Sequence, residues 1–297
     1  MGMNSFVFQL YRIVVPKPIR KKILLSQLQK KIPAYYASIP SSKNDAEVKE
    51  VLHFIKGNGV HIFPYEFTAQ YDLSSIAVFD DLATGLKYVL QDGKRLYFKR
   101  RWSADRIRRS FHDLTLEQDA KSPHRYLSAE FDLNADDVLA DFGAAEGNFS
   151  LSVIERVKKI YLFEADQEWI EALQYTFAPW KDKVEIVPKF ISDKNDDRNC
   201  SGDTYFKDKE VSFLKIDVDG GERGLLKGFE KILSNRKPMR IALCTYHLHT
   251  DQLDFTELLE KDGYNVTPSP GYMIFYYDKK LRAPYLRRAL IRAAKMN

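Results

Sequence analysis

The chain has 297 residues, 44% of them hydrophobic and 13% aromatic, so it can bury a full-size core and exceeds one minimal domain. Its net charge of +5 hides an asymmetry, because residues 1–44 carry eight basic and no acidic side chains, and residues 279–297 carry seven and none. The body between them holds 31 basic against 41 acidic residues, which disfavours a nucleic-acid partner.

The cysteine content and the apolar runs bear on the compartment. Cys200 and Cys244 have no metal-binding or redox spacing, which indicates a reducing compartment and excludes a disulfide framework. No segment approaches the roughly 18 uninterrupted apolar residues of a spanning helix, and the N-terminal run lacks a signal-cleavage site. Phe6 stands where myristoylation requires Ser or Thr. We therefore expect a cytoplasmic protein, whose basic ends are either solvated tails or a peripheral contact with the inner face of an anionic membrane.

The first 127 residues show no α/β alternation. The spacing predicts a basic helix over residues 6–35, followed by the linker SIPSSKND. Asp92 and Gly93 suit a type I′ turn between two runs of strand formers, and a helical pattern then continues up to Pro123. We expect residues 1–127 to form an extension of helices and a hairpin that caps the substrate site or mediates homo-oligomerisation.

From about residue 136, short strand-like runs alternate with amphipathic helical stretches. The runs are DVLAD, KIYLFEA, KVEIVP, SFLKID and IALCTY. This pattern predicts a mostly parallel sheet with helices on both faces, over residues 128–278. Two further runs, YNVTP and YMIFYY, predict a C-terminal hairpin. Residues 279–297 show helical spacing, with Leu286, Leu290 and Ala293 on one side and arginines on the other, and predict a basic C-terminal helix.

The segment DFGAAEGNFS, residues 141–150, joins the first strand of this pattern to a helix. Gly143 and Gly147 permit backbone conformations and close approaches that a side chain would forbid. The dinucleotide fingerprint G-x-G-x-x-G is absent, and the carboxylates of Asp141 and Glu146 would repel a pyrophosphate. Such a loop suits a cationic or zwitterionic ligand such as S-adenosylmethionine.

Glu164 supports this hypothesis. It ends the second strand-like run, 17 residues after Gly147, which is enough for one helix, a turn and a strand. A carboxylate at that position can accept hydrogen bonds from both hydroxyls of a ribose.

Several motifs together resemble a known family. DFGAAEGNFSL, YLFEAD, VSFLKIDVDGGERGLLKGFEKIL, CTYH and LLEKDGYNV occur in the order and at the spacings of the FkbM-type family of S-adenosylmethionine-dependent methyltransferases. The resemblance covers about residues 128–276, and LKIDVDGGE is its most specific block. Asp219 stands where the family commonly has Glu, and Ala165 where it commonly has Pro. Asp219 keeps the carboxylate, and Ala165 is expected to affect only a turn.

The resemblance implies a class I methyltransferase fold, which is Rossmann-like with a seven-stranded sheet, and O-methylation of a sugar or polyketide hydroxyl. The acceptor would then be a small molecule or a glycan. The expected cofactor contacts lie at the first four strand ends: Asp141, Gly143, Ala144, Glu146, Gly147, Asn148, Glu164, Ala165, Ile191, Ser192 and Asp217.

A hydroxyl acceptor must lose its proton, so a general base or a metal ion is expected. His247 is the favoured base, because its ordinary pKa of about 6.5 suits proton removal near neutral pH. Asp217 and Asp219 could orient it or hold the acceptor. Together with Glu222 they could bind a divalent cation, although Glu222 also suits a helix start. His124, just before the first strand, is a rival base.

Three other functions remain open at this stage. A non-catalytic module with this fold could dock on an anionic membrane or glycan. A nicotinamide-dependent oxidoreductase is disfavoured by the missing third glycine and the two acids of the loop. Nucleic-acid methylation is disfavoured by the acidic body, unless the basic ends supply the groove.

Overall fold

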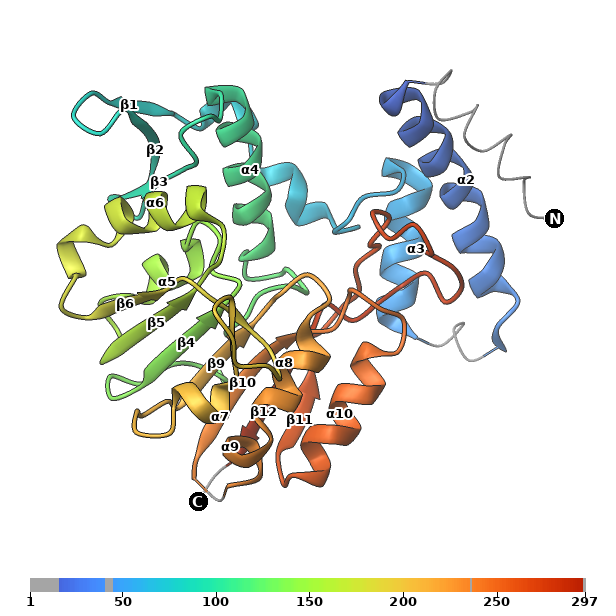
Figure 1. The fold of residues 1–297 in the computed structure, drawn as a ribbon. Coiled ribbons are helices and arrows are strands. Elements are labelled where there is room, and N and C mark those ends of the chain that lie inside the picture. The colour runs from blue at the N-terminus through green and yellow to red at the C-terminus, as the bar shows by residue number, and fades with distance from the viewer. Residues whose placement is uncertain (1–15, 41–44, 236, 296–297) are drawn as a thin grey trace. The chain divides into compact units, whose positions relative to one another are not determined.

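The computed structural model describes residues 16–40, 45–235 and 237–295 (Figure 1). They form two compact units. Among the described residues, one unit lies between residues 16 and 68 and over 271–287, and the other between 69 and 270 and over 288–295. The expected boundary at residue 127/128 therefore does not separate the units, because residues 69–127 belong with the sheet.

A seven-stranded sheet organises the second unit, with the order β11-β12-β10-β9-β4-β5-β6 among the described residues (Figure 1). Its pairs are parallel from β10 through β9, β4 and β5 to β6, whereas β12 runs antiparallel to both β10 and β11. The strands are β4 (Val138–Phe142), β5 (Lys159–Phe163), β6 (Val184–Val187), β9 (Phe213–Ile216), β10 (Met239–Cys244), β11 (Asn265–Pro268) and β12 (Leu290–Lys295). The predicted mostly parallel α/β fold is confirmed.

Helices cover both faces of this sheet. All five residues of β4 are buried, and their side chains alternate between two apolar clusters. One cluster includes side chains of α4 (Ala104–Glu117), α5 (Asn148–Val153) and α6 (Gln167–Thr176). The other lies against α8 (Glu222–Gly228), α9 (Glu230–Ser234) and α10 (Asp251–Lys261), and a short helix α7 (Gly202–Tyr205) leads into it. Because both faces of these strands are buried, their sequences are continuous apolar runs.

The end of the chain differs from its prediction. Residues 290–295 form the interior strand β12, so no C-terminal helix is present among residues 279–295. Leu290 packs in one apolar cluster and Ile291 and Ala293 in the other, which is the alternation of a strand buried on both faces. The partner of β11 is therefore β12. The predicted strand YMIFYY lies in the first unit instead, where only Met273 pairs, with Arg287.

The predicted hairpin is present and belongs to the sheet unit. β2 (Leu86–Gln91) pairs with β3 (Lys94–Tyr97), and β1 (Phe79–Asp81) adds a third strand. Asp92 and Gly93 both have positive φ, as a type I′ turn requires. The Gln91 amide donates to the Asn148 carbonyl at 2.7 Å and so ties the hairpin to the start of α5.

The first unit is helical. It contains α2 (Lys17–Ala37), α3 (Ala46–Asn58) and the segment 271–287, and two short 3-10 turns, Glu66–Gln70 and Leu73–Ser75, follow α3 along the chain. Asp45 caps α3 by accepting the Val48 N–H. The Ile274 N–H donates to the Ile62 carbonyl, which ties residues 271–287 to the unit. The predicted helix over residues 6–35 is found from residue 17, and its first part lies outside the described residues.

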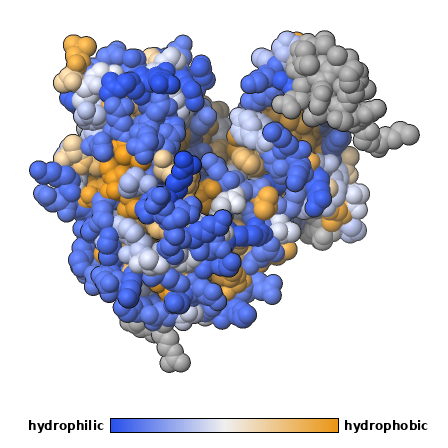
Figure 2. All heavy atoms as spheres, in the orientation of Figure 1, coloured by the Kyte–Doolittle hydropathy of each residue, from blue (hydrophilic) through white to orange (hydrophobic). Residues whose placement is uncertain are grey.

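The surface and the helices bear on membrane contact. Hydrophilic side chains cover most of the face shown in Figure 2, with smaller hydrophobic areas between them. Within the described part of the chain, no helix combines the length and the apolarity that crossing a bilayer requires.

Candidate active site

The loop after β4 has the backbone geometry that its glycines predicted. Gly143 and Gly147 have φ values of 72° and 78°. A Cβ on Gly143 would lie 2.0 Å from the carbonyl oxygen of Asp217, and one on Gly147 would lie 2.7 Å from Leu173. Only glycine allows the loop to pass so close to the end of β9. The left-handed residue Gly147 then starts α5.

Asp141 is placed differently from its prediction. Its carboxylate is 1% exposed, lies 2.9 Å from the Lys215 ammonium and accepts a hydrogen bond from the Ser150 hydroxyl at 2.7 Å. Lys215 also donates to the Gly143 carbonyl at 2.9 Å. Burial opposes the charge of Lys215, but the carboxylates of Asp141 and Asp217 raise its pKa well above the ordinary value. The ion pair holds the loop from beneath, so Asp141 stabilises the loop and does not line the cavity beside it.

Glu164 lies where the sequence predicted. It follows β5 and accepts the N–H of Ala145 at 2.9 Å and that of Asp166 at 2.8 Å. These bonds aim the carboxylate into a cavity of about 480 Å³ at the carboxyl edge of the sheet. The cavity is lined by Gly143, Ala145, Phe163, Glu164, Ala165, Asp166, Trp169, Lys189, Phe190, Ile191, Asp217, Val218, Asp219 and Gly221.

The predicted cofactor contacts divide into two groups. Gly143, Glu164, Ala165, Ile191 and Asp217 line this cavity. The others do not: Asp141, Ala144, Glu146, Gly147, Asn148 and Ser192. Ala144, Glu146 and Gly147 are buried within the loop, and Asn148 lines a second cavity beside the hairpin.

Sequence reasoning missed part of the wall. Trp169 comes from the first turn of α6, and Lys189 and Phe190 follow the end of β6. Strand order alone could have indicated Lys189 and Phe190, because the carboxyl ends of parallel strands share one edge of the sheet. The indole and phenyl rings add apolar surface to a wall otherwise rich in carboxylates.

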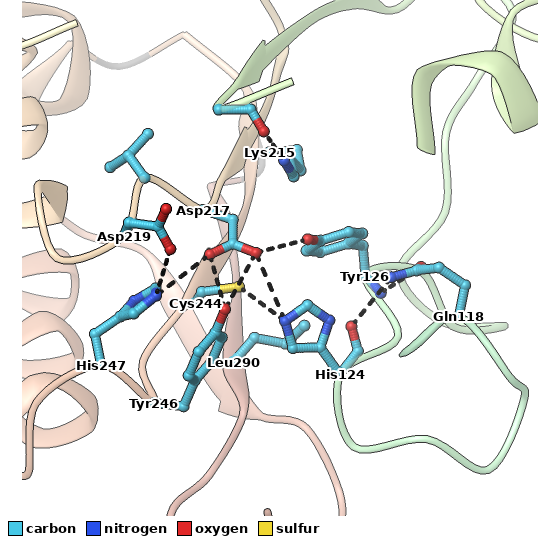
Figure 3. Close-up of polar contacts among 12 residues, drawn as sticks. Gln118, His124, Tyr126, Lys215, Asp217, Asp219, Cys244, Tyr246, His247 and Leu290 are labelled. Carbon is cyan, nitrogen blue, oxygen red and sulfur yellow. Dashed lines mark hydrogen bonds and ion pairs between the residues drawn. The ribbon is translucent and has the colours of Figure 1, made fainter. Parts of the chain in front are cut away.

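A polar cluster surrounds Asp217 beside the cavity (Figure 3). The hydroxyls of Tyr126 and Tyr246 each donate to its carboxylate at 3.1 Å. His124 and His247 each place Nε2 3.7 Å from it, on either side. Burial would raise the pKa of Asp217, but the positive charges of Lys215 and His247 and the hydrogen bond from Tyr126 hold it below its ordinary value. The cluster therefore keeps a carboxylate ionised in a buried position.

His247 lies among three carboxylates. Its Nδ1 is 3.1 Å from Glu222, and its Nε2 is 3.7 Å from both Asp217 and Asp219. Burial would lower the pKa of His247, but the bonds to Asp219 and Glu222 and the charge of Asp217 raise it to about 10. The imidazole is therefore protonated near neutral pH and cannot accept a proton there. The geometry does not support the predicted role of His247 as the base.

His124 behaves in the opposite way. It is 1% exposed, and burial lowers its pKa to about 4 despite the charge of Asp217. Its Nε2 also lies 3.6 Å from the Cys244 sulfur, and burial raises the pKa of that thiol well above the ordinary value. A neutral histidine this deep in the protein positions Asp217 and does not itself reach an acceptor.

Three of the same residues could serve as ligands of a metal ion. Ligand atoms of Asp217, Glu222 and His247 lie within 4.8 Å of one another, whereas the predicted member Asp219 has a fully exposed side chain. Glu222, however, already accepts the N–H groups of Val218 and Gly220 and so closes the turn before α8. A divalent cation would also have to displace the proton of His247. The arrangement of Asp217, Glu222 and His247 therefore fits a protonated histidine held by carboxylates better than a bound metal ion.

In the comparisons with known proteins, similarity was found to solved structures and to nothing else that was compared. No family model matches the sequence, and no curated protein matches it. The methyltransferase FkbM from Methylobacillus flagellatus KT is 16% identical with a TM-score of 0.45, over 64% of this chain and 54% of that chain. Precorrin-6y C5,15-methyltransferase from Geobacter metallireducens GS-15 is 15% identical with a TM-score of 0.38, over 67% and 94%.

A third structure is M. jannaschii TYW2 in complex with AdoMet, 16% identical with a TM-score of 0.37, over 74% of this chain and 85% of that chain. The present chain spans about half the length of the FkbM structure that it matches.

Proposed function

We propose that this chain is an S-adenosylmethionine-dependent methyltransferase. The observation that carries the proposal is the cavity of about 480 Å³ between Glu164 and Asp217, at the carboxyl ends of β4, β5 and β9. Its size is that of a cofactor pocket, and open α/β sheets bind their ligands at this edge. Glu164 would accept the ribose hydroxyls, and the ring of Trp169 or Phe190 would contact the adenine.

The charges of the site favour a cationic methyl donor. Glu164, Asp166, Asp217 and Asp219 all line the cavity, against one lysine, Lys189. A pyrophosphate would be repelled by such a wall, whereas a sulfonium and an ammonium would be attracted. This distribution also argues against a nicotinamide dinucleotide as the cofactor.

We further propose that the acceptor is a hydroxyl, of a carbohydrate or a similar polyol. Asp217 would hold the hydroxyl in line with the methyl group, because its carboxylate lies at the cavity wall and is ionised. As the new O–C bond forms, the S–CH₃ bond breaks and the hydroxyl becomes strongly acidic. A carboxylate of low pKa can then accept its proton, so a free histidine base is not required.

The remaining residues of the cluster have supporting roles in this mechanism. Tyr126 and Tyr246 fix the orientation of Asp217 through their hydroxyls. The imidazolium of His247 compensates the negative charge of the three carboxylates around it. A nucleic-acid acceptor is not favoured, because the sheet unit carries 32 basic and 36 acidic residues.

Calorimetric titration with S-adenosylhomocysteine tests the first proposal. We expect binding by the folded protein, and a Glu164→Ala variant should lose about 1.5–3 kcal/mol of binding free energy. Glu168→Ala is the matched control, since Glu168 is a partly exposed carboxylate in the first turn of α6 that does not line the cavity. Absence of binding by protein shown to be folded would refute the assignment.

The acceptor is tested separately, by the release of S-adenosylhomocysteine in the presence of a panel of sugars and glycans. Turnover that needs a free hydroxyl and disappears in Asp217→Asn supports O-methylation. Cofactor binding without turnover on any acceptor would favour the rival hypothesis of a non-catalytic module.

A further inference from the structure

The N-terminal half of α2 exposes aliphatic side chains to solvent. Ile19 is 51% exposed, Ile23 40% and Leu24 39%. In the second half of the same helix, by contrast, Leu28, Ile32 and Tyr36 are buried. Ile19 and Ile23 are one helical turn apart and so lie on the same face of α2, and Leu24 follows about 100° round the helix from Ile23.

The same helical segment is strongly basic. Lys17, Lys21 and Lys22 are exposed and Arg20 is half-buried, and α2 contains no acidic residue along its 21 positions. The imbalance extends to the whole unit: residues 1–68 and 271–287 carry 14 basic and 5 acidic residues, a net charge of +9. The sheet unit carries −4, so the positive charge is concentrated in the unit that contains α2.

The segment 271–287 of this unit adds an aromatic and basic edge. The Lys21 ammonium lies 5.3 Å from the ring centre of Tyr276 and 5.8 Å from that of Tyr277. Tyr277 is 59% exposed, and Lys279 and Lys280 beyond it are exposed as well. Lys21 is two positions from both Ile19 and Ile23 and so lies on the opposite side of α2, which means that this segment adds to the positive charge of the unit and not to its aliphatic face.

We propose that the N-terminal half of α2 forms a docking surface for an anionic lipid bilayer. The α2 surface, as we call it, consists of the exposed residues Ile19, Ile23 and Leu24 with Lys17 and Lys22 on either side of them. The lysines would bind lipid phosphates and carboxylates, and the aliphatic side chains would insert among the acyl chains near the headgroups. A soluble polyanion such as a nucleic acid would satisfy the lysines but leave the isoleucines in water, so the combination favours a membrane.

Vesicle co-sedimentation with the full chain tests this proposal. We expect binding to phosphatidylcholine vesicles that contain phosphatidylserine, weaker binding at higher salt, and little binding to phosphatidylcholine alone. The pair Ile19→Ser and Ile23→Ser should lower the affinity about tenfold or more, and so should the pair Lys17→Glu and Lys22→Glu.

The controls use exposed residues of the sheet unit. Leu253→Ser removes a side chain on α10 that is 67% exposed, and Lys207→Glu reverses an exposed charge. Both variants should sediment with vesicles like the wild type. Circular dichroism melting would confirm that every variant is folded, and only folded variants would be compared.

Insertion has a direct readout as well. Both native cysteines are buried, so Ile23→Cys can be labelled with an environment-sensitive fluorophore. Its emission should shift to the blue with phosphatidylserine vesicles and stay unchanged with heparin or single-stranded DNA. The proposal is overturned if the full chain does not bind the vesicles, if the isoleucine variants bind like the wild type, or if DNA produces the same shift.

Discussion

Asp141 and Asp217 end neighbouring strands and share Lys215 as a nearby cation, yet their surroundings differ. Asp141 is closed in by Lys215 and Ser150 and does not line the cavity, so its charge is used to hold the glycine loop. Asp217 is held by two tyrosine hydroxyls and remains at the cavity wall. Two strand-end carboxylates can therefore differ in role: Asp141 stabilises the loop, and Asp217 is the reacting group in our proposal, because their hydrogen-bond and ion-pair partners differ.

The largest effect is expected at Asp217. Asp217→Asn keeps the size of the side chain but removes its charge, so turnover should fall by about 100- to 10,000-fold, as for a lost general base. Asp219→Asn is the comparison, because that side chain is fully exposed and should cost less than about tenfold. Initial rates with saturating S-adenosylmethionine would measure both. Equal losses in the two variants would contradict the assignment of the chemistry to Asp217.

The supporting role of Asp141 is tested through Lys215. Lys215→Met leaves the Asp141 carboxylate buried without its ion-pair partner, which should cost about 3–5 kcal/mol of unfolding free energy. Chemical denaturation measures this loss. The double variant Lys215→Met with Asp141→Asn should recover part of it, because the buried charge is gone. A single variant as stable as the wild type would mean that the ion pair does not hold the loop.

The Asp217 cluster should also show a pH dependence of its own. The pKa of His247 is raised in the folded protein to about 10, from about 6.5 in the unfolded chain. The stability from its protonation is therefore fully present below about pH 6.5 and is lost as the pH rises to about 10. Urea denaturation at pH 6, 8 and 10 should show the wild type losing its lead over His247→Gln. A lead that grew with pH would indicate a neutral His247.

The smallest effect is expected from replacing Gly143 or Gly220 by alanine. The comparison separates a steric clash of the new Cβ from backbone strain. Gly143→Ala would place a Cβ 2.0 Å from the Asp217 carbonyl, whereas Gly220→Ala meets nothing within 4 Å, although both residues have positive φ. Gly220→Ala should cost about 1 kcal/mol, and Gly143→Ala about 1–3 kcal/mol more together with weaker cofactor binding. Thermal melts and calorimetry would measure both. Similar costs would show that strain alone explains the glycine at 143.

Much of the fold was predictable from local patterns. The alternating runs predicted the parallel sheet, Asp92 and Gly93 the hairpin turn, and the position of Glu164 its place at the cavity wall. The last strand was not predictable, because Leu286, Leu290 and Ala293 fit helical spacing while residues 290–295 also alternate as a strand does. These residues form a strand and not a helix because they lie between β10 and β11. That position depends on the assembly of the whole sheet.

The candidate site was predictable only in part, for a similar reason. The hydrogen bond from Tyr126 to Asp217 joins residues 91 positions apart, which no local motif reveals. The pKa of His247 depends on three carboxylates that only the fold brings together, so its ordinary value could not predict its protonation state. Ion pairing of Asp141 with Lys215 likewise follows from the register of β4 against β9.

The position of β12 has a consequence for synthesis in the cell. This strand lies between β10 and β11 in the sheet, yet it follows both of them in the sequence. While the ribosome is still translating residues 290–295, β11 has no partner in the sheet and β10 has one open edge. The nascent protein must therefore keep a gap in its sheet until these residues emerge, and a chaperone that covers unpaired strands would act on it at that stage.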